Sequence, residues 1–334
     1  MSNVIKLSGL LLALILLTAC SGVSDTRPEV IRKSERYLKQ GVEAYGNSDY
    51  VAATDFFTRA LAHYRSIDDL EGTLFSHINL AETAMAAGAY DAVRQQLSDA
   101  DRVAKTLGKT EYEPRLNLLW AQSYWREGLK DKALDTLSPL LPLFSAEQVQ
   151  QSVGTLELTA LMLRTGIAFS SLEEDAKDAQ LWLRRLESAF ERSSNTSPLH
   201  QARLYRFQGQ WLMHQGELVQ AGKLFQDALN IYRPAASRPA IAATLSESAR
   251  LAIRLHKWQQ AEDFLLRALF IRVWILDRIG SAEVLQLLSE VYRAQQRQSA
   301  AEEAAEWSRH IREDKATDWR NLGQQYLQRP LISR

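Results

Sequence analysis

Cysteine is almost absent from this chain, since Cys20 is the only one in 334 residues. A single thiol cannot form an internal disulfide, so a folded domain must be held together by packing alone. Glycine and proline are also sparse, with 15 and 8 residues, whereas Ala, Leu, Gln, Glu and Arg are abundant. Because the abundant residues form helices well and the scarce ones interrupt them, the composition predicts an all-α chain.

Neither sign of charge is in excess, because 40 basic side chains are matched by 40 acidic ones. Removal of Lys6 with an N-terminal leader would leave an excess of one acidic side chain. A protein that binds nucleic acid in bulk carries a basic patch and an elevated isoelectric point. The charge balance therefore predicts no nucleic-acid partner.

Motifs for catalysis and metal binding are missing as well. The chain has no His-Glu-x-x-His, no phosphate-binding loop and no Gly-x-Ser-x-Gly elbow. Carboxylate pairs such as Glu173–Glu174 are typical of solvated helix faces. The sequence thus predicts no enzyme, no metal site and no cofactor. The histidines stand singly, without metal-ligand spacing, at His63, His77, His200, His214, His256 and His310.

The first residues have the features of an export signal. Lys6 precedes an apolar run over residues 7–17, interrupted only by Ser8 and Gly9. A helix that spans a membrane needs about 20 apolar residues, so this run is too short to be one.

The end of this segment, Leu-Thr-Ala-Cys at residues 17–20, resembles a bacterial lipobox. The resemblance implies that residues 1–19 are a cleaved signal peptide and that Cys20 carries acyl chains, of which more than one gives stable anchoring. An ordinary secretory signal and an uncleaved anchor are the alternatives, and the position of the lone cysteine favours the lipobox. Ser21, where enteric lipoproteins kept in the inner membrane have Asp, resembles an outer-membrane address, with the body in the periplasm. Residues 20–30 form a polar tether.

A pattern of small and aromatic residues recurs every 40 residues. In the first copy, Gly41 is followed by Ala44, Tyr50, Ala53 and Phe57. The small position recurs at 81, 121, 209, 249 and 289, and the gap between 121 and 209 leaves room for one degenerate unit. The pattern resembles the tetratricopeptide repeat, in which small residues lie where the two helices of a hairpin cross, and it covers residues 31–308.

The chain departs from that family in its period, which is 40 residues rather than about 34, and in lacking a proline at the end of the unit. The extra residues are expected to lengthen the helices or the turn between units, as in Ser66–Gly72. A coincidental helical bundle and another class of helical-hairpin solenoid are the alternatives.

The resemblance implies an all-α, right-handed superhelical solenoid of about six clear repeats and one degenerate repeat. Prolines within residues 138–145 and a polar run at residues 193–198 mark breaks. The expected organisation is a first block at residues 31–145, a degenerate middle repeat at 146–198, a second block at 199–312 and a capping helix at 313–334. In the cap, Trp319, Leu322 and Tyr326 share one face.

In tetratricopeptide proteins the first helix of each hairpin lines a concave surface. Carried over to this chain, that rule gives an apolar, aromatic surface in the early units and a group of arginines further on. Arginine pairs bidentately with carboxylates; the alternative is that these arginines pair with neighbouring glutamates or face water. The candidate partner-binding residues are Tyr45, Phe75, Arg115, Trp125, Arg126, Arg203, Arg206, Arg250 and Arg254. The same rule places Gln210, Met213, His214, Ile253 and Glu290 on this surface.

These features predict a membrane-anchored, periplasmic scaffold or adaptor that holds envelope proteins of a pilus, secretion, cell-wall or outer-membrane machine. An acidic segment or a chain terminus is the expected ligand. The alternatives are a groove that binds a small molecule or a glycan strand through Trp125, Tyr45 and the arginines, and an enzyme without a known motif.

Overall fold

A computed structural model describes residues 27–313, except residues 48, 88, 142–153, 194–195 and 276. In this part the chain forms fourteen α-helices and no strand, which confirms the predicted all-α fold. None of these helices has the length and apolar character needed to cross a bilayer. The predicted signal peptide, Cys20, the tether up to residue 26 and the capping segment after residue 313 lie outside the described residues.

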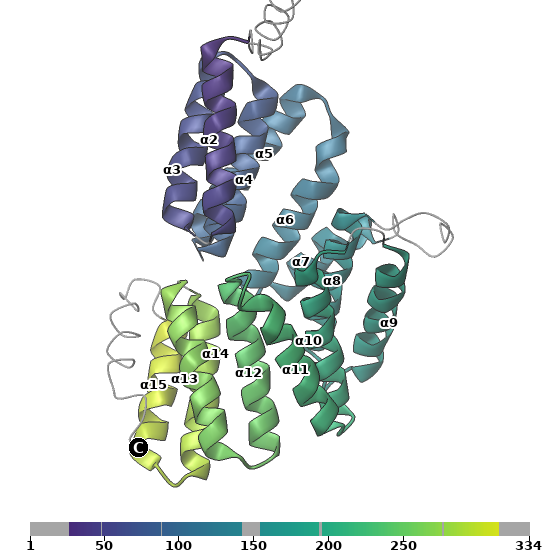
Figure 1. The fold of residues 1–334 in the computed structure, drawn as a ribbon, viewed down its shortest axis with the longest axis vertical. Helices are drawn as coiled ribbons and strands as arrows, with labels where there is room; N and C mark the ends of the chain where they lie inside the picture. The colour runs from purple at the N-terminus through teal and green to yellow at the C-terminus, as the bar shows by residue number, and fades with distance from the viewer. Residues whose placement is uncertain are drawn as a thin grey trace, which may run out of the picture.

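The helices form seven hairpins that pack against one another in chain order (Figure 1). The seven hairpins match the predicted solenoid of six clear repeats and one degenerate repeat. They are α2 (Glu29–Gly46) with α3 (Tyr50–Ser66), α4 (Leu70–Ala86) with α5 (Tyr90–Leu107), α6 (Glu113–Arg126) with α7 (Lys130–Leu137), α8 (Thr155–Phe169) with α9 (Ala176–Arg192), α10 (Pro198–His214) with α11 (Leu218–Tyr232), α12 (Arg238–Arg254) with α13 (Trp258–Trp274), and α14 (Arg278–Ala294) with α15 (Gln298–Glu313).

The long period resides in the helices. Most of them have 15 to 18 residues, and three-residue turns such as residues 127–129 and 215–217 join them. A 34-residue unit with two such turns would have helices of about 14 residues. In the expected long turn Ser66–Gly72, only residues 67–69 lie outside α3 and α4. Longer helices give each hairpin a wider inner face.

In six of the seven hairpins, all except α8 with α9, a small residue of the first helix is paired with a residue sixteen positions later in the second. Gly41 and Gly209 are paired with the buried rings of Phe57 and Phe225. A Cβ atom added to Gly41 would lie 2.4 Å from the Phe57 ring, and one added to Gly209 would lie 2.6 Å from Phe225.

The other hairpins use different sizes at the same two positions. Ala81, Ala121 and Ala249 are paired with leucines, namely Leu97, Leu137 and Leu265, and all six are fully buried. The last hairpin has Ser289 and Ala305 at these positions. A larger residue on one helix thus accompanies a smaller one on the other, as close packing of a fixed space requires.

The turns within the hairpins share one backbone form. In six of the seven hairpins the last turn residue donates its N–H to a carbonyl five residues back, as from Leu129 to Tyr124 at 2.8 Å and from Lys257 to Ala252 at 2.9 Å. This pattern is the Schellman motif, which needs a left-handed residue just before the donor. Gly128 and Gly216 supply it with φ values of 79° and 89°. His256 takes the same conformation without glycine, at 55°.

The middle of the chain departs from the regular repeat. Helix α7 has only 8 residues and is followed by a short 3-10 helix, η2 (Ser138–Leu140). At the crossing of α8 and α9, Thr165 donates to the Leu161 carbonyl at 2.8 Å and to the Trp182 carbonyl at 3.2 Å. In Figure 1, α2 to α5 form an upper group, α8 to α15 a lower group, and α6 and α7 join them.

Candidate functional site

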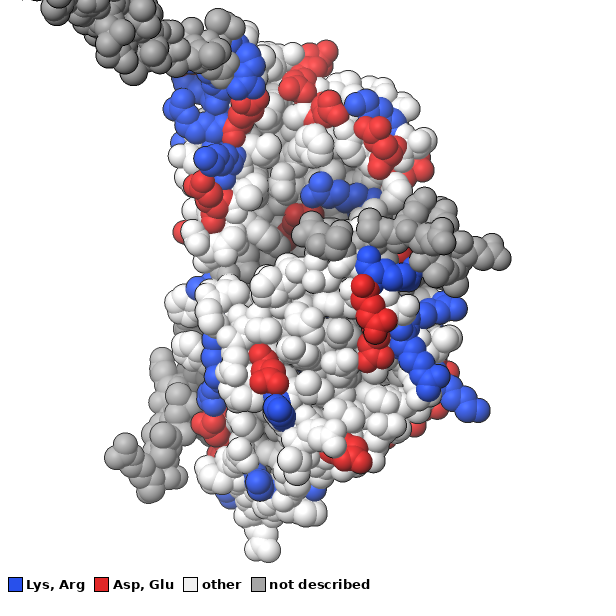
Figure 2. Space-filling view, turned by 45° about the vertical axis from the view of Figure 1, so that its right-hand side comes forward, with Lys and Arg blue, Asp and Glu red and all other residues white. Residues whose placement is uncertain are grey.

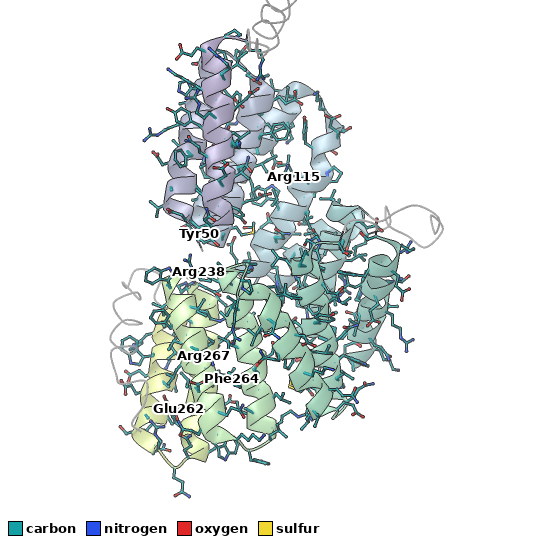
Figure 3. All side chains as sticks on the ribbon, viewed as in Figure 1. Tyr50, Arg115, Arg238, Glu262, Phe264 and Arg267 are labelled. Carbon is teal, nitrogen blue, oxygen red and sulfur yellow. The ribbon has the colours of Figure 1, made fainter. Side chains whose placement is uncertain are left out.

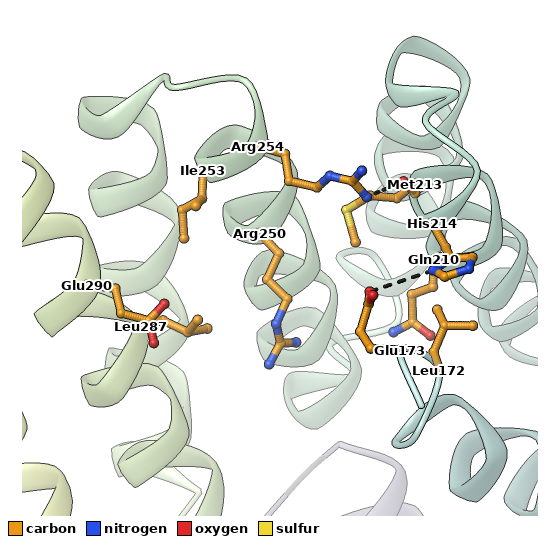
Figure 4. A pocket seen from close by; sticks show the side chains of 10 residues that line it. All are labelled: Leu172, Glu173, Gln210, Met213, His214, Arg250, Ile253, Arg254, Leu287 and Glu290. Carbon is orange, nitrogen blue, oxygen red and sulfur yellow. Dashed lines mark hydrogen bonds and ion pairs between the residues drawn. The ribbon is translucent and has the colours of Figure 1, made fainter. Parts of the chain in front are cut away.

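The first helices of the later hairpins surround a pocket of about 240 Å³ (Figure 4). Helices α10, α12 and α14 line it together with the turn after α8, which lies beside α10. Because the repeat period is 40 residues, positions 210, 250 and 290 occupy equivalent places on these three helices. The lining residues are Leu172, Glu173, Gln210, Met213, His214, Arg250, Ile253, Arg254, Leu287 and Glu290.

Two of the predicted arginines lie in this pocket and already have contacts there. Arg254 donates from Nη1 to the Met213 carbonyl, so it ties α12 to the last turn of α10. Arg250 pairs with Glu247 of its own helix at 3.1 Å. Close by, His214 Nδ1 lies 3.6 Å from Glu173 Oε1. Arg254 is therefore a structural tie, whereas the Arg250 side chain stays 43% exposed at the pocket.

One polar atom at the pocket lacks a partner. The side-chain oxygen of Gln210 is buried and accepts no hydrogen bond from any of the described residues. A buried acceptor without a donor costs free energy, and such groups are rare in native structures. Gln210 itself lines the pocket, so this unsatisfied oxygen lies beside the space that a ligand would occupy.

A second cluster lies on α10 toward its N-terminus. Arg203 and Arg206 lie one turn apart, with their guanidinium carbons 5.9 Å and 5.7 Å from the centre of the buried Phe207 ring. Among the described residues neither has an ion-pair partner, and the buried Nε of Arg206 has no hydrogen-bond acceptor. Tyr232 of α11 and Arg126 of α6 are near enough to act on Arg203 electrostatically.

The charge of this cluster is not compensated. Burial lowers the pKa of Arg203 to about 10, and the positive charges of Arg206 and Arg126 add to the effect. Burial likewise raises the pKa of Tyr232, against the opposing influence of the two arginines on α10. The folded protein therefore holds like charges together at a cost in stability.

The early predicted residues are used mainly inside the fold. Arg115 of α6, labelled in Figure 3, pairs with Glu82 of α4 at 3.1 Å. Phe75 packs edge-on against the Tyr112 ring at 5.8 Å, in the 3-10 helix η1 (Thr110–Tyr112). Trp125 packs on the core of the α6–α7 hairpin. The structure does not bring these three together with the arginines on α10.

Tyr45, at the end of α2, lies with its ring 5.8 Å from that of Tyr50 and is 37% exposed. Burial of its hydroxyl end raises the pKa of Tyr45 to about 12, and the negative charge of Glu82 adds to the shift. Arg126 is exposed, and its positive charge lowers the pKa of both Tyr45 and Arg203. It therefore lies between the early and the late parts of the surface.

Most of the pocket follows from the repeat register. Besides Arg250 and Arg254, the register places five other lining residues on the concave surface, namely Gln210, Met213, His214, Ile253 and Glu290. The sequence analysis missed Leu172, Glu173 and Leu287. The first two belong to the turn after α8, in the degenerate unit, where no repeat signal indicates the position of a side chain. The face in Figure 2 carries basic and acidic side chains interspersed.

This architecture defines an all-α solenoid of helix hairpins with a concave inner surface. A family model described as tetratricopeptide repeat matches residues 200–272, which cover nearly all of α10 to α13. The chain thus contains tetratricopeptide-like repeats, a type that in general serves as a scaffold for protein partners. The fold is typical of proteins without catalytic activity.

Among solved structures the chain is similar to BtubC (BKLC) from P. vanneervenii, with 17% sequence identity and a TM-score of 0.32. That similarity covers 86% of this chain and 92% of BtubC. No curated protein matches the chain. In the part that the structure describes, no group of three His, Cys, Asp or Glu side chains could hold a metal ion.

Replacing Arg203 with Met tests whether the arginine cluster costs stability. Met places an apolar side chain of similar length beside Phe207 and removes a half-buried charge, so the free energy of unfolding at pH 7 should rise by about 1 kcal/mol or more. The unfolded chain binds the proton more tightly than the folded one, so the penalty is fully present below pH 10 and fades above it.

Urea unfolding followed by circular dichroism measures this difference, with Arg267→Met on α13 as the matched control. Arg267 pairs with Asp263 at 3.0 Å on the surface, so its loss should change stability by less than about 0.5 kcal/mol. A destabilised Arg203→Met variant would contradict the interpretation of an uncompensated cluster.

Proposed function

We propose that this protein is a lipid-anchored scaffold of the bacterial envelope that faces the periplasm from the outer membrane. The N-terminal support is the lipobox-like segment at residues 17–20 and the short polar tether that follows it. A body attached in this way stays close to the membrane, and confinement raises its effective concentration toward other membrane-held partners. A partner within an envelope machine is the expected ligand.

The observation that carries the proposal is the inner surface of α10, α12 and α14. It combines the pocket with the unpaired arginines and the unsatisfied Gln210 oxygen. Groups left without partners in a folded protein are typical of surfaces that receive a ligand. The alternative of a small-molecule site is less favoured, because ligand pockets commonly have about 300–1,000 Å³ and this one has about 240 Å³.

Changing Cys20 to Ser tests the anchor. The variant should lose metabolic labelling with an alkyne-tagged fatty acid and move from the outer-membrane to the soluble periplasmic fraction, because Ser offers no thiol for acylation. Ser21→Ala serves as the control and should keep both label and location. Retention of the label by Cys20→Ser would contradict the lipid anchor.

Site-specific photo-crosslinking in the native bacterium tests the scaffold. A photoreactive side chain at Glu290, exposed at the rim of the pocket, should yield discrete adducts with a protein partner. The same group at Asp263, exposed on the second helix α13, is the matched control and should yield few. Equal adducts from both positions, or none from Glu290, would contradict a partner on the inner surface.

A further inference from the structure

Helix α10 carries both the arginine cluster and one wall of the pocket. Arg203, Arg206, Gln210 and Met213 follow at intervals of three or four residues, so they lie along one face of the helix. The first two belong to the cluster and the last two line the pocket. A ligand that contacts this face meets positive charge at one end and a pocket at the other.

The N-terminal end of the face lacks an anion. Arg203 and Arg206 have no carboxylate partner among the described residues, and the Nε of Arg206 is buried without an acceptor. Arginine side chains that are partly buried normally pair with a carboxylate, often through two parallel hydrogen bonds. The nearby Tyr232, only 3% exposed, is close enough for both arginines to act on it electrostatically.

The C-terminal end of the face suits an aliphatic side chain. Met213, Ile253, Leu172 and Leu287 supply apolar atoms to the pocket wall. The volume of about 240 Å³ is small for a cofactor or a drug-sized ligand. Between the two ends lies the buried side-chain oxygen of Gln210, which accepts no hydrogen bond from the described residues.

The distance between the arginine cluster and the pocket determines how far apart the charged group and the aliphatic group of a ligand must lie. Arg206 and Met213 are seven residues apart on one helix, which is about 10 Å at a rise of 1.5 Å per residue. An extended chain advances about 3.3 Å per residue, so three residues cover this distance.

Building on the proposed function, we propose that this face of α10 binds a short extended segment of the partner in which a carboxylate lies three residues from an aliphatic side chain. The carboxylate pairs with Arg203 and Arg206, and the aliphatic side chain enters the pocket between α10, α12 and α14. An apolar pocket beside the cations favours a peptide over a phosphate-rich polymer, which would place charge at every step.

Fluorescence anisotropy with labelled eight-residue peptides tests the proposal directly. The probe contains one Leu and one Asp three positions apart in a Gly/Ser background and has an amidated C-terminus, so Asp is its only carboxylate. Replacing Asp with Asn, or moving it next to Leu, should weaken binding by about tenfold or more. Raising the salt concentration should weaken the binding of the Asp probe alone.

The matching protein variant is Arg203→Met with Arg206→Met, which keeps unbranched apolar side chains beside Phe207. It should bind the Asp probe about tenfold more weakly and bind the Asn peptide unchanged. Arg267→Met, on α13, should bind the Asp probe like the unaltered protein. Circular dichroism verifies that both variants are folded, and the salt dependence of the unaltered protein tests the pairing without any substitution.

Equal affinity for the Asp and Asn peptides, equal affinity for both spacings, or no binding at millimolar peptide would overturn the proposal. These results are distinct from a failure of the scaffold itself. If Glu290 adducts persist in the double arginine variant while the peptides show no preference, the scaffold function is supported and the proposed pairing of a carboxylate with the two arginines is contradicted. If the unaltered protein gives no Glu290 adducts, the proposed scaffold function itself is contradicted.

Discussion

The size match at each helix crossing is the contact on which the rest of this structure depends. Gly41 and Gly209 leave room for the rings of Phe57 and Phe225, while Ala at the same position accompanies Leu. Each pair fixes how closely its two helices approach, and neighbouring hairpins then bury the apolar faces that one hairpin alone leaves exposed. No disulfide can take over this role, since the chain has a single cysteine.

Regular crossings also create the inner surface. Because α10, α12 and α14 repeat at the same interval, residues 210, 250 and 290 come to surround one pocket. The same surface holds groups that the fold does not satisfy, above all Arg203, Arg206 and the Gln210 oxygen. A core selected for stability alone would avoid such groups. Their presence on the face that the architecture leaves open supports a role in binding.

The fold could be predicted from the sequence because its signal is repeated. The small position at 41 recurs in five further units, so a weak local pattern becomes a strong one. The degenerate unit was predictable only as a gap of suitable length, since its helix contact includes the hydroxyl of Thr165, which donates to carbonyls of both α8 and α9. The sequence also left open whether the extra residues of each unit lengthen the helices or the turns, because helix length and turn length contribute equally to the period.

The site was less predictable for a physical reason. A repeat register gives the face of a helix, but it does not say whether an arginine on that face finds a carboxylate. Arg115 and Arg250 have acidic partners, Arg254 bonds a carbonyl, and Arg203 and Arg206 have none among the described residues. Arg250 pairs within its own helix, whereas the partner of Arg115 lies on another helix, and only the three-dimensional structure shows such a contact.

The most direct test of the size match is a double-mutant cycle on Gly41 and Phe57, measured as the free energy of unfolding in urea. Gly41→Ala alone should destabilise by about 1–3 kcal/mol, because its Cβ would lie 2.4 Å from a buried ring. Adding Phe57→Leu, which reproduces the Ala–Leu pair of the next hairpin, should make the double variant at least about 1 kcal/mol more stable than the sum of the single effects. Gly46→Ala in the same helix, with open space around its Cα, should not destabilise. Additive effects of the two substitutions, or a harmless Gly41→Ala, would contradict the account.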